Sequence, residues 1–124
     1  MILGVGIDLC EVDRMEKALA DGAFLRRFFT PEEGAYILSR GKGAAQSMAG
    51  HFAAKEALLK AMGIGITVPL KDIAVTHGEH GAPGFILTGA ALARFTEMGG
   101  QKSHLSITHT DTTAAAVAIV EGMP

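Results

Sequence analysis

Three groups of residues in this sequence have types and spacings that could support catalysis, and the first is a single carboxylate. Asp8 stands near the end of a run of glycines and aliphatic residues, where a lone carboxylate is costly to bury unless it is paired or bound to a metal. The same side chain could instead cap a helix that begins a few residues later. This segment alone supports both interpretations equally.

The second group is Glu56 and Lys60, which are four residues apart and therefore share one face of a predicted helix. An exposed ion pair at this spacing contributes about 0.2 to 0.5 kcal/mol, and most such pairs do nothing more. Phe52 and Leu59 make the surroundings apolar, so the pair could instead lie in a cleft. There the acid could bind Mg²⁺ while the ammonium neutralises phosphate.

The third group lies in a predicted strand that contains Ser106 and His109. Strand alternation places Ser106 and Thr108 on one face and turns His109 to the other. His109 could bind phosphate, although the residues alone favour a hydrogen-bonded histidine of the core. A serine hydrolase is less favoured, because Ser106 lies within a strand and the sequence has no G-x-S-x-G turn.

The other histidines and the glycines form no recognisable ligand site. His77, His80 and His104 lack a metal-binding spacing, and we expect them to be solvated turn residues. The sequence also lacks the G-x-x-x-x-G-K-[ST] phosphate loop and a strand-linked dinucleotide fingerprint. Any phosphate group must therefore be bound by other means.

Composition excludes several classes of function. The 11 basic and 13 acidic residues give a net charge of -2, which does not favour a nucleic-acid or membrane-surface protein. No segment approaches the ~18 to 20 uninterrupted apolar residues of a membrane span, and no basic leader precedes the first apolar run. The single cysteine, Cys10, cannot form a disulfide within the chain, so we expect a reduced, cytoplasmic setting.

A scaffold of alternating short strands and helices must position these groups, and the 124 residues fit one domain, 1–124. Periodicity and capping signals predict strands at 2–9, 73–76, 85–87, 104–109 and 114–120, and helices at 13–20, 31–39, 45–62 and 89–98. The fold class is therefore α+β.

Two of these strands have informative faces. In 2–9 one face is aliphatic (Leu3, Val5, Ile7, Leu9). On the other, which we call the thin face, Gly4 and Gly6 have no side chains and leave room for a neighbouring strand or a ligand. The strand 114–120 is apolar on both faces, so we expect it to be buried on both.

In their order along the chain, the motifs resemble holo-[acyl-carrier-protein] synthases, the small bacterial type of 4'-phosphopantetheinyl transferase. The resemblance spans nearly the whole chain. It rests on Gly4-Val5-Gly6-Ile7-Asp8-Leu9 with Arg14 following, Phe28-Phe29-Thr30 with Glu33, Phe52-Ala53-Ala54-Lys55-Glu56-Ala57 with Lys60-Ala61, and Ser106-Ile107-Thr108-His109. It implies a small, mainly antiparallel sheet packed against a long central helix and shorter helices.

The resemblance also implies a reaction, which serves fatty acid biosynthesis in this family. A serine hydroxyl of an apo acyl carrier protein attacks the coenzyme A phosphate that bears the pantetheine arm, and 3',5'-ADP leaves. Asp8 and Glu56 are implied to bind Mg²⁺, with coenzyme A pyrophosphate oxygens and water completing its shell. Lys60 would neutralise or protonate the departing oxygen. The general base is either Glu56 or a water on the metal.

The resemblance also implies residues that bind coenzyme A and the carrier protein, from their positions relative to the family's motifs. His51 and His109 map to positions near the coenzyme A phosphates, and His51 stands where arginine is commoner, so its contact is expected to be weaker and pH dependent. Arg14, with Arg26 and Arg27 as companions, is implied to dock the acidic carrier protein. The family is typically a homotrimer with sites between subunits.

Two other functions use the same residues. A metal-dependent nucleotide pyrophosphohydrolase would use the same pair of acids with water as the nucleophile. A non-catalytic module would bind the carrier protein or coenzyme A without turnover.

Overall fold

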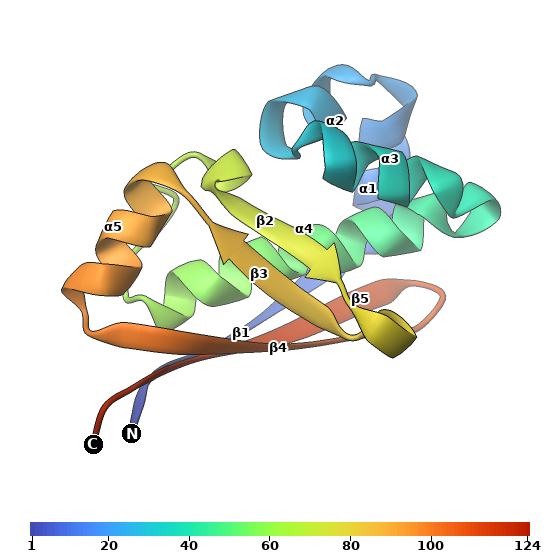
Figure 1. Ribbon diagram of the computed structural model, residues 1–124. Coiled ribbons are helices and arrows are strands. Elements are labelled where there is room, and N and C mark those ends of the chain that lie inside the picture. Colours follow the sequence, from blue (N-terminus) through green and yellow to red (C-terminus); the bar gives the residue numbers. More distant parts are fainter.

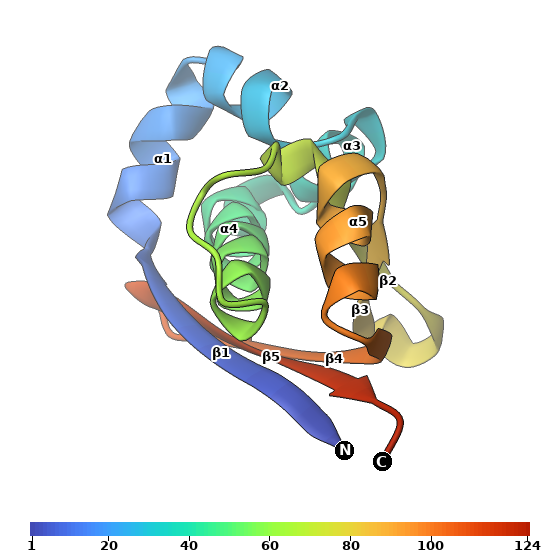
Figure 2. The same ribbon diagram turned by 90° about the vertical axis from the view of Figure 1, so that its left-hand side faces the viewer.

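Five strands form two antiparallel sheets in the computed structural model, which describes residues 1–124. Strand β5 (Thr113–Gly122) lies between β1 (Ile2–Glu11) and β4 (Gly100–His109) in the larger sheet. A separate hairpin joins β2 (Ile73–His77) to β3 (Pro83–Leu87). The larger sheet curves around the long helix α4 (Ala44–Ala61), which lies along its hollow face (Figures 1 and 2).

Shorter helices surround the rest of α4. Helices α1 (Val12–Ala20), α2 (Ala23–Phe28) and α3 (Pro31–Ser39) gather over its N-terminal half, and α5 (Gly89–Glu97) stands beside its C-terminal end (Figure 1). Three 3₁₀ turns complete the chain, at Gly41–Gly43, Leu70–Asp72 and Glu79–Gly81. The predicted α+β class, with an antiparallel sheet against a long central helix, is confirmed. No helix combines the length and the apolar character that crossing a membrane requires.

Local signals explain which elements the sequence predicted well. Helix α3 has its predicted bounds because Thr30 and Glu33 form a capping box: the Thr30 hydroxyl accepts from the Glu33 amide at 3.2 Å, and the Glu33 carboxylate accepts from the Thr30 amide at 3.0 Å. Helix α2 was not predicted, because six residues are too few to display a helical period.

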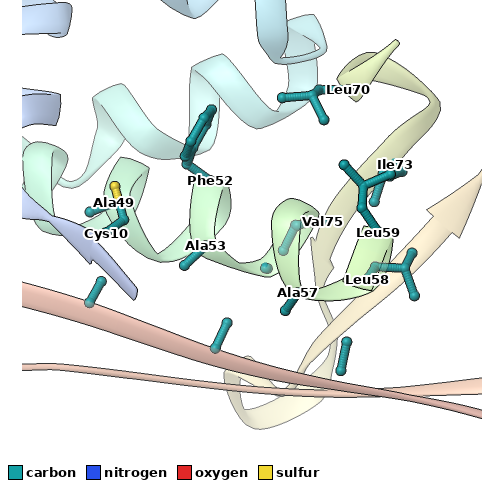
Figure 3. Packing of buried hydrophobic residues seen from close by; sticks show 14 of the residues in the cluster. Cys10, Ala49, Phe52, Ala53, Ala57, Leu58, Leu59, Leu70, Ile73 and Val75 are labelled. Carbon is teal, nitrogen blue, oxygen red and sulfur yellow. The ribbon is translucent and has the colours of Figure 1, made fainter. Parts of the chain in front are cut away.

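Helix α4 lies unusually close to β1 because neither surface has large side chains there. A Cβ on Gly4 would overlap the carbonyl oxygen of Ala61, and a Cβ on Gly6 would overlap that of Ala57. Figure 3 shows the alanine side chains of α4 directed at the sheet. The thin face of β1 therefore receives a helix, and the expectation of a neighbouring strand or a ligand against the two glycines is wrong.

This packing leaves the aliphatic face of β1 uncovered. Val5, Ile7 and Leu9 are 57%, 64% and 64% exposed. Strand β5 buries alternate residues (Ala114, Ala116, Ala118 and Val120) against α4, whereas Val117 and Ile119 on its other face are half-exposed. The expectation that this strand is buried on both faces is thus wrong for the single chain, because α4 covers only one side of the sheet.

A buried ion pair joins α3, α4 and β2. The ammonium of Lys55 lies 2.8 Å from a carboxylate oxygen of Glu33, and it donates to the carbonyls of Leu70 and Ile73 at 2.9 Å each. The second oxygen of Glu33 accepts from the Val75 amide at 3.0 Å. Burial lowers the pKa of Lys55 and Glu33 opposes that shift, but three acceptors require all three ammonium protons, so Lys55 is charged.

Candidate active site

Asp8 and Lys60 meet where β1 passes the C-terminal half of α4. The glycine face of β1 turns Asp8 towards the helix, and the Lys60 ammonium lies 2.8 Å from its carboxylate and 3.0 Å from the Ile7 carbonyl. The Asp8 side chain is 12% exposed and that of Lys60 is 55% exposed. Lys60 therefore pairs with Asp8, and the exposed Glu56–Lys60 ion pair considered from the sequence does not form.

Glu56 lies one helical turn before Lys60 and is close to Asp8. Burial raises the pKa of Glu56 and the charge on Asp8 raises it further, whereas Arg14 and Lys60 lower it. The hydrogen bond to Asp8 raises the pKa of Lys60, which keeps that side chain cationic. Two mutually repelling carboxylates form an anionic site that a divalent cation would stabilise.

The donor set at this site fits Mg²⁺. This ion characteristically binds one or two carboxylates and completes its shell with water and substrate phosphate oxygens. No group of three or more histidine, cysteine, aspartate or glutamate side chains is arranged to hold a metal. Burial raises the pKa of the nearby Cys10 thiol to about 11, so this thiol stays protonated. The fold thus brings together the two acids that the sequence implied, Asp8 and Glu56.

Three exposed arginines lie on the neighbouring helices α1 and α2. The Arg14 guanidinium lies 5.1 Å from the centre of the Phe52 ring, and that of Arg27 lies 5.1 Å from the Phe28 ring. Arg26 is exposed on α2 beside Arg27. Because Arg14 lowers the pKa of Glu56, Arg14 borders the carboxylate site.

A second polar region is a cavity of about 280 Å³ at the N-terminal half of α4. Its polar lining comes from α3, α4 and the ends of β2 and β4, and comprises Tyr36, Arg40, Gln46, Ser47, His51, His77 and His109. His51 is buried, and its Nδ1 lies 2.6 Å from the Ser47 carbonyl. His109 is exposed at the end of β4, so the expectation of a core histidine is wrong.

His77 is the residue that sequence reasoning missed. It was expected to be a solvated turn residue, but it is half-buried at the end of β2, with its Nε2 3.1 Å from Nε2 of His51. Its ring stacks on Tyr36, with centres 3.9 Å apart. His80 is exposed in a turn as expected, whereas His104 lies within β4 and contacts Glu121 at 3.0 Å. No local signal reveals a contact between residues 26 positions apart.

The two polar regions point in different directions from one helix. His51 and Glu56 are five positions apart on α4, which places them about 140° apart around its axis. None of Asp8, Glu56 and Lys60 lines the histidine cavity. Within one chain, therefore, the carboxylate site and the cavity are separate.

Comparison with protein families decides what kind of molecule this is. The family described as the 4'-phosphopantetheinyl transferase superfamily matches residues 4–119. The chain belongs to this superfamily. The family predicted from the motifs is therefore confirmed.

Individual members of the superfamily resemble the chain over its full length. The holo-[acyl-carrier-protein] synthase of Treponema denticola is 54% identical over 123 residues, which cover 98% of this chain and 100% of that protein. The solved holo-[acyl-carrier-protein] synthase from Neisseria meningitidis has a TM-score of 0.86 at 33% identity, covering 98% of this chain and 99% of that chain. The synthase from Bacillus anthracis, solved in complex with coenzyme A (3',5'-ADP), has a TM-score of 0.82 at 35% identity, covering 99% of each chain.

Proposed function

We propose that the chain transfers 4'-phosphopantetheine from coenzyme A to a serine of an apo acyl carrier protein, giving the holo carrier protein and 3',5'-ADP. The observation that carries the proposal is the meeting of Asp8, Glu56 and Lys60 in a chain that matches a holo-[acyl-carrier-protein] synthase from end to end. Membership of a phosphopantetheinyl transferase superfamily supports the same reaction.

Asp8 and Glu56 are the proposed protein ligands of Mg²⁺. Their position on opposed elements, β1 and α4, leaves the rest of the ion's shell to water and to coenzyme A pyrophosphate. When bound, the ion supplies electrostatic stabilisation of the negative charge that develops on the pyrophosphate. The chain contributes the geometry, because Asp8 is fixed by its ladder pairing with β5 and Glu56 by the helix.

Lys60 is the proposed partner of the leaving group. Its raised pKa keeps the ammonium charged, and its half-exposed position allows it to reach a phosphate oxygen while it remains bound to Asp8. Neutralising the charge on the departing 3',5'-ADP is therefore its role. Removal of the serine proton falls to Glu56 or to a water held at the site.

Substrate binding divides between the two polar regions. His51 and His109 in the cavity are proposed to contact coenzyme A phosphates, and coenzyme A is bound by the similar synthase from Bacillus anthracis. Arg14, Arg26 and Arg27 are proposed to dock the carrier protein, since exposed cations beside the carboxylate site would attract an acidic partner.

We further propose a homotrimer with sites between subunits, working in the cytoplasm in fatty acid biosynthesis. The exposed aliphatic side chains of β1 would be buried between copies, and such a face is unusual on a monomer. Assembly would also bring the carboxylates of one copy to the histidine cavity of another, which the single chain keeps apart.

Release of 3',5'-ADP from coenzyme A, with and without apo carrier protein, separates this proposal from its alternatives. We expect release only when the carrier and Mg²⁺ are both present. Release with free phosphopantetheine and no carrier would identify a pyrophosphohydrolase. Binding of coenzyme A without any release would identify a non-catalytic module. The named relatives are synthases, so the comparisons support neither alternative.

A further inference from the structure

His51 and His77 form a direct imidazole pair in the wall of the cavity, with their Nε2 atoms 3.1 Å apart. Nδ1 of His51 lies 2.6 Å from the Ser47 carbonyl, and because a carbonyl only accepts, this nitrogen carries a hydrogen. When His51 is neutral, its Nε2 is therefore an acceptor. The hydrogen in the pair then belongs to His77, which donates from Nε2.

The pair can accept one more proton without losing a hydrogen bond. Protonation of His77 at Nδ1, which has no hydrogen-bond partner in the chain, leaves its Nε2–H donating to His51. A second proton would set two N–H groups and two positive charges against each other on rings with centres 5.0 Å apart. Burial lowers the pKa of His51, so the added charge resides on the less buried His77.

Tyr36 of helix α3 positions His77, and Arg40 directly after the helix adds positive charge to the cavity. Tyr36 stacks on the His77 ring with an angle of 11° between the planes, which fixes the direction of Nε2 towards His51. Arg40 lies 5.6 Å from the centre of the Tyr36 ring and lines the same cavity. This permanent positive charge attracts an anion into the cavity.

The lining of the cavity suits an anion, and Glu32 of α3 lies outside it, in a neighbouring pocket that His77 also lines. Glu33 on α3 and Lys55 on α4 act on His51 in opposite senses, and they are bound to each other. His109 enters from β4, and none of the lining residues is acidic. Gly43, the residue before α4, also lines the cavity, so the positive end of the helix dipole lies at its edge.

We propose that the His51–His77 pair is a proton-coupled phosphate site: when a phosphate group of the donor nucleotide enters the cavity, one proton moves from solvent to Nδ1 of His77. The inference rests on the proposed function, which supplies the nucleotide. It assigns His77 a part in donor binding and makes that binding sensitive to pH.

The direction of the pH dependence follows from the proton count. The complex holds one more proton than its separated components, so binding is tightest at low pH and weakens as pH rises through the titration of the bound pair. The phosphate itself has a second pKa of about 6 and favours binding in the opposite direction. This effect of the phosphate is the same in every variant. A difference in pH dependence between the wild type and a His77 variant therefore measures the contribution of His77.

Calorimetric titration of the full chain with 3',5'-ADP, without carrier protein, measures the proton directly. Runs at about pH 7.5 in two buffers of different ionisation enthalpy give the number of protons taken up. We expect uptake in the wild type and its loss in His77→Gln, whose amide can still donate to His51 but cannot become charged. His80→Asn, in the adjoining exposed turn at a φ of 59° that asparagine tolerates, should behave as wild type.

Equal proton uptake by the wild type and His77→Gln would overturn the proposal. A second outcome that needs no variant also contradicts it, namely a wild-type affinity for 3',5'-ADP that does not fall between about pH 6.5 and pH 8, where we expect a loss of about tenfold. Neither result depends on turnover. Failure of the proposed function would show as absent transfer to a carrier protein, so the two failures are distinguishable.

Discussion

Glu56 supplies a charge that the carboxylate site cannot replace, and the change Glu56→Gln removes this charge while keeping the shape of the side chain. We expect transfer activity to fall by at least about a hundredfold, because stabilisation of developing charge is usually the largest catalytic contribution. Thermal stability should be unchanged or slightly higher, since Asp8 repels Glu56. Initial rates and thermal denaturation measure both effects.

The matched control is Glu97→Gln on α5, where the carboxylate is 75% exposed and bound only to Arg94. This variant should keep wild-type activity. Retention of full activity by Glu56→Gln would show that Glu56 is not a metal ligand.

Arg14 is the one of the three arginines that acts on Glu56, and reversal of its charge tests carrier docking. We expect Arg14→Glu to raise the KM for the carrier protein by about tenfold or more at low salt, with a smaller effect at high salt, because screening weakens electrostatic steering. The KM for coenzyme A should change little. Lys102→Glu, an identical change of charge on β4, is the control. Equal carrier KM values for the two variants would contradict the docking assignment.

The sequence predicted individual site residues far better than their contacts. Asp8 and Glu56 could be proposed from their surroundings and motifs, and the structure brings them together. The partner of Lys60 could not be predicted, because helical spacing pointed to Glu56 and the fold supplied Asp8 from 52 residues away. His77 was missed for the same physical reason: its place in the cavity depends on contacts with Tyr36 and His51.

At the scale of elements, the close approach of α4 to β1 holds Asp8 against the helix. We expect Gly6→Ala to destabilise the protein by about 1 to 3 kcal/mol, because its methyl group would overlap the Ala57 carbonyl and force the two elements apart. Activity should fall by more than the loss of folded protein explains, since Asp8 moves with β1. Chemical denaturation and kinetics at a temperature where the variant is folded measure the two effects.

Gly65→Ala provides the control for this change, because a Cβ there meets nothing within 4 Å. Its stability should lie within about 0.5 kcal/mol of wild type. If Gly6→Ala is equally harmless, the close packing of α4 on β1 does not hold in solution.

The Lys55–Glu33 pair joins three elements, and breaking it should be costly. We expect Lys55→Met to lower the free energy of unfolding by about 3 to 5 kcal/mol, because Glu33 would be left as an unpaired buried charge. Adding Glu33→Gln should recover part of the loss, since the buried charge is then removed as well. Lys42 lies in an exposed 3₁₀ turn, so Lys42→Met is the control. If Lys55→Met lowers the free energy of unfolding no more than Lys42→Met does, this account is refuted.

Elements with strong local signals were predicted closely, and the directions of their faces were not. Capping fixed α3, and composition predicted α4 within one residue at each end. The sequence of β1 distinguished an aliphatic face from a thin face but did not reveal that a helix covers the thin one. The helix fits there because the glycines of β1 and the alanines of α4 are complementary, a property of the pair that neither segment displays alone.

At the scale of the whole molecule, the uncovered face of β1 tests assembly. We expect Ile7→Glu to convert the proposed trimer to monomers and to reduce activity in parallel, because a charge would be buried between copies. Light scattering coupled to size exclusion measures the mass in solution. Ile86→Glu, at a comparably exposed isoleucine of β3, should leave both properties unchanged. An Ile7→Glu protein with wild-type mass would contradict the proposed interface.

The central claim is that the chain modifies a carrier protein with the arm of coenzyme A, and the intact mass of an apo carrier protein tests it most directly. After incubation with the chain, coenzyme A and Mg²⁺, we predict a mass increase of one 4'-phosphopantetheine, with no increase when the acceptor serine is changed to alanine. An unchanged mass for the serine-bearing carrier, with folded protein and all components present, would contradict the account.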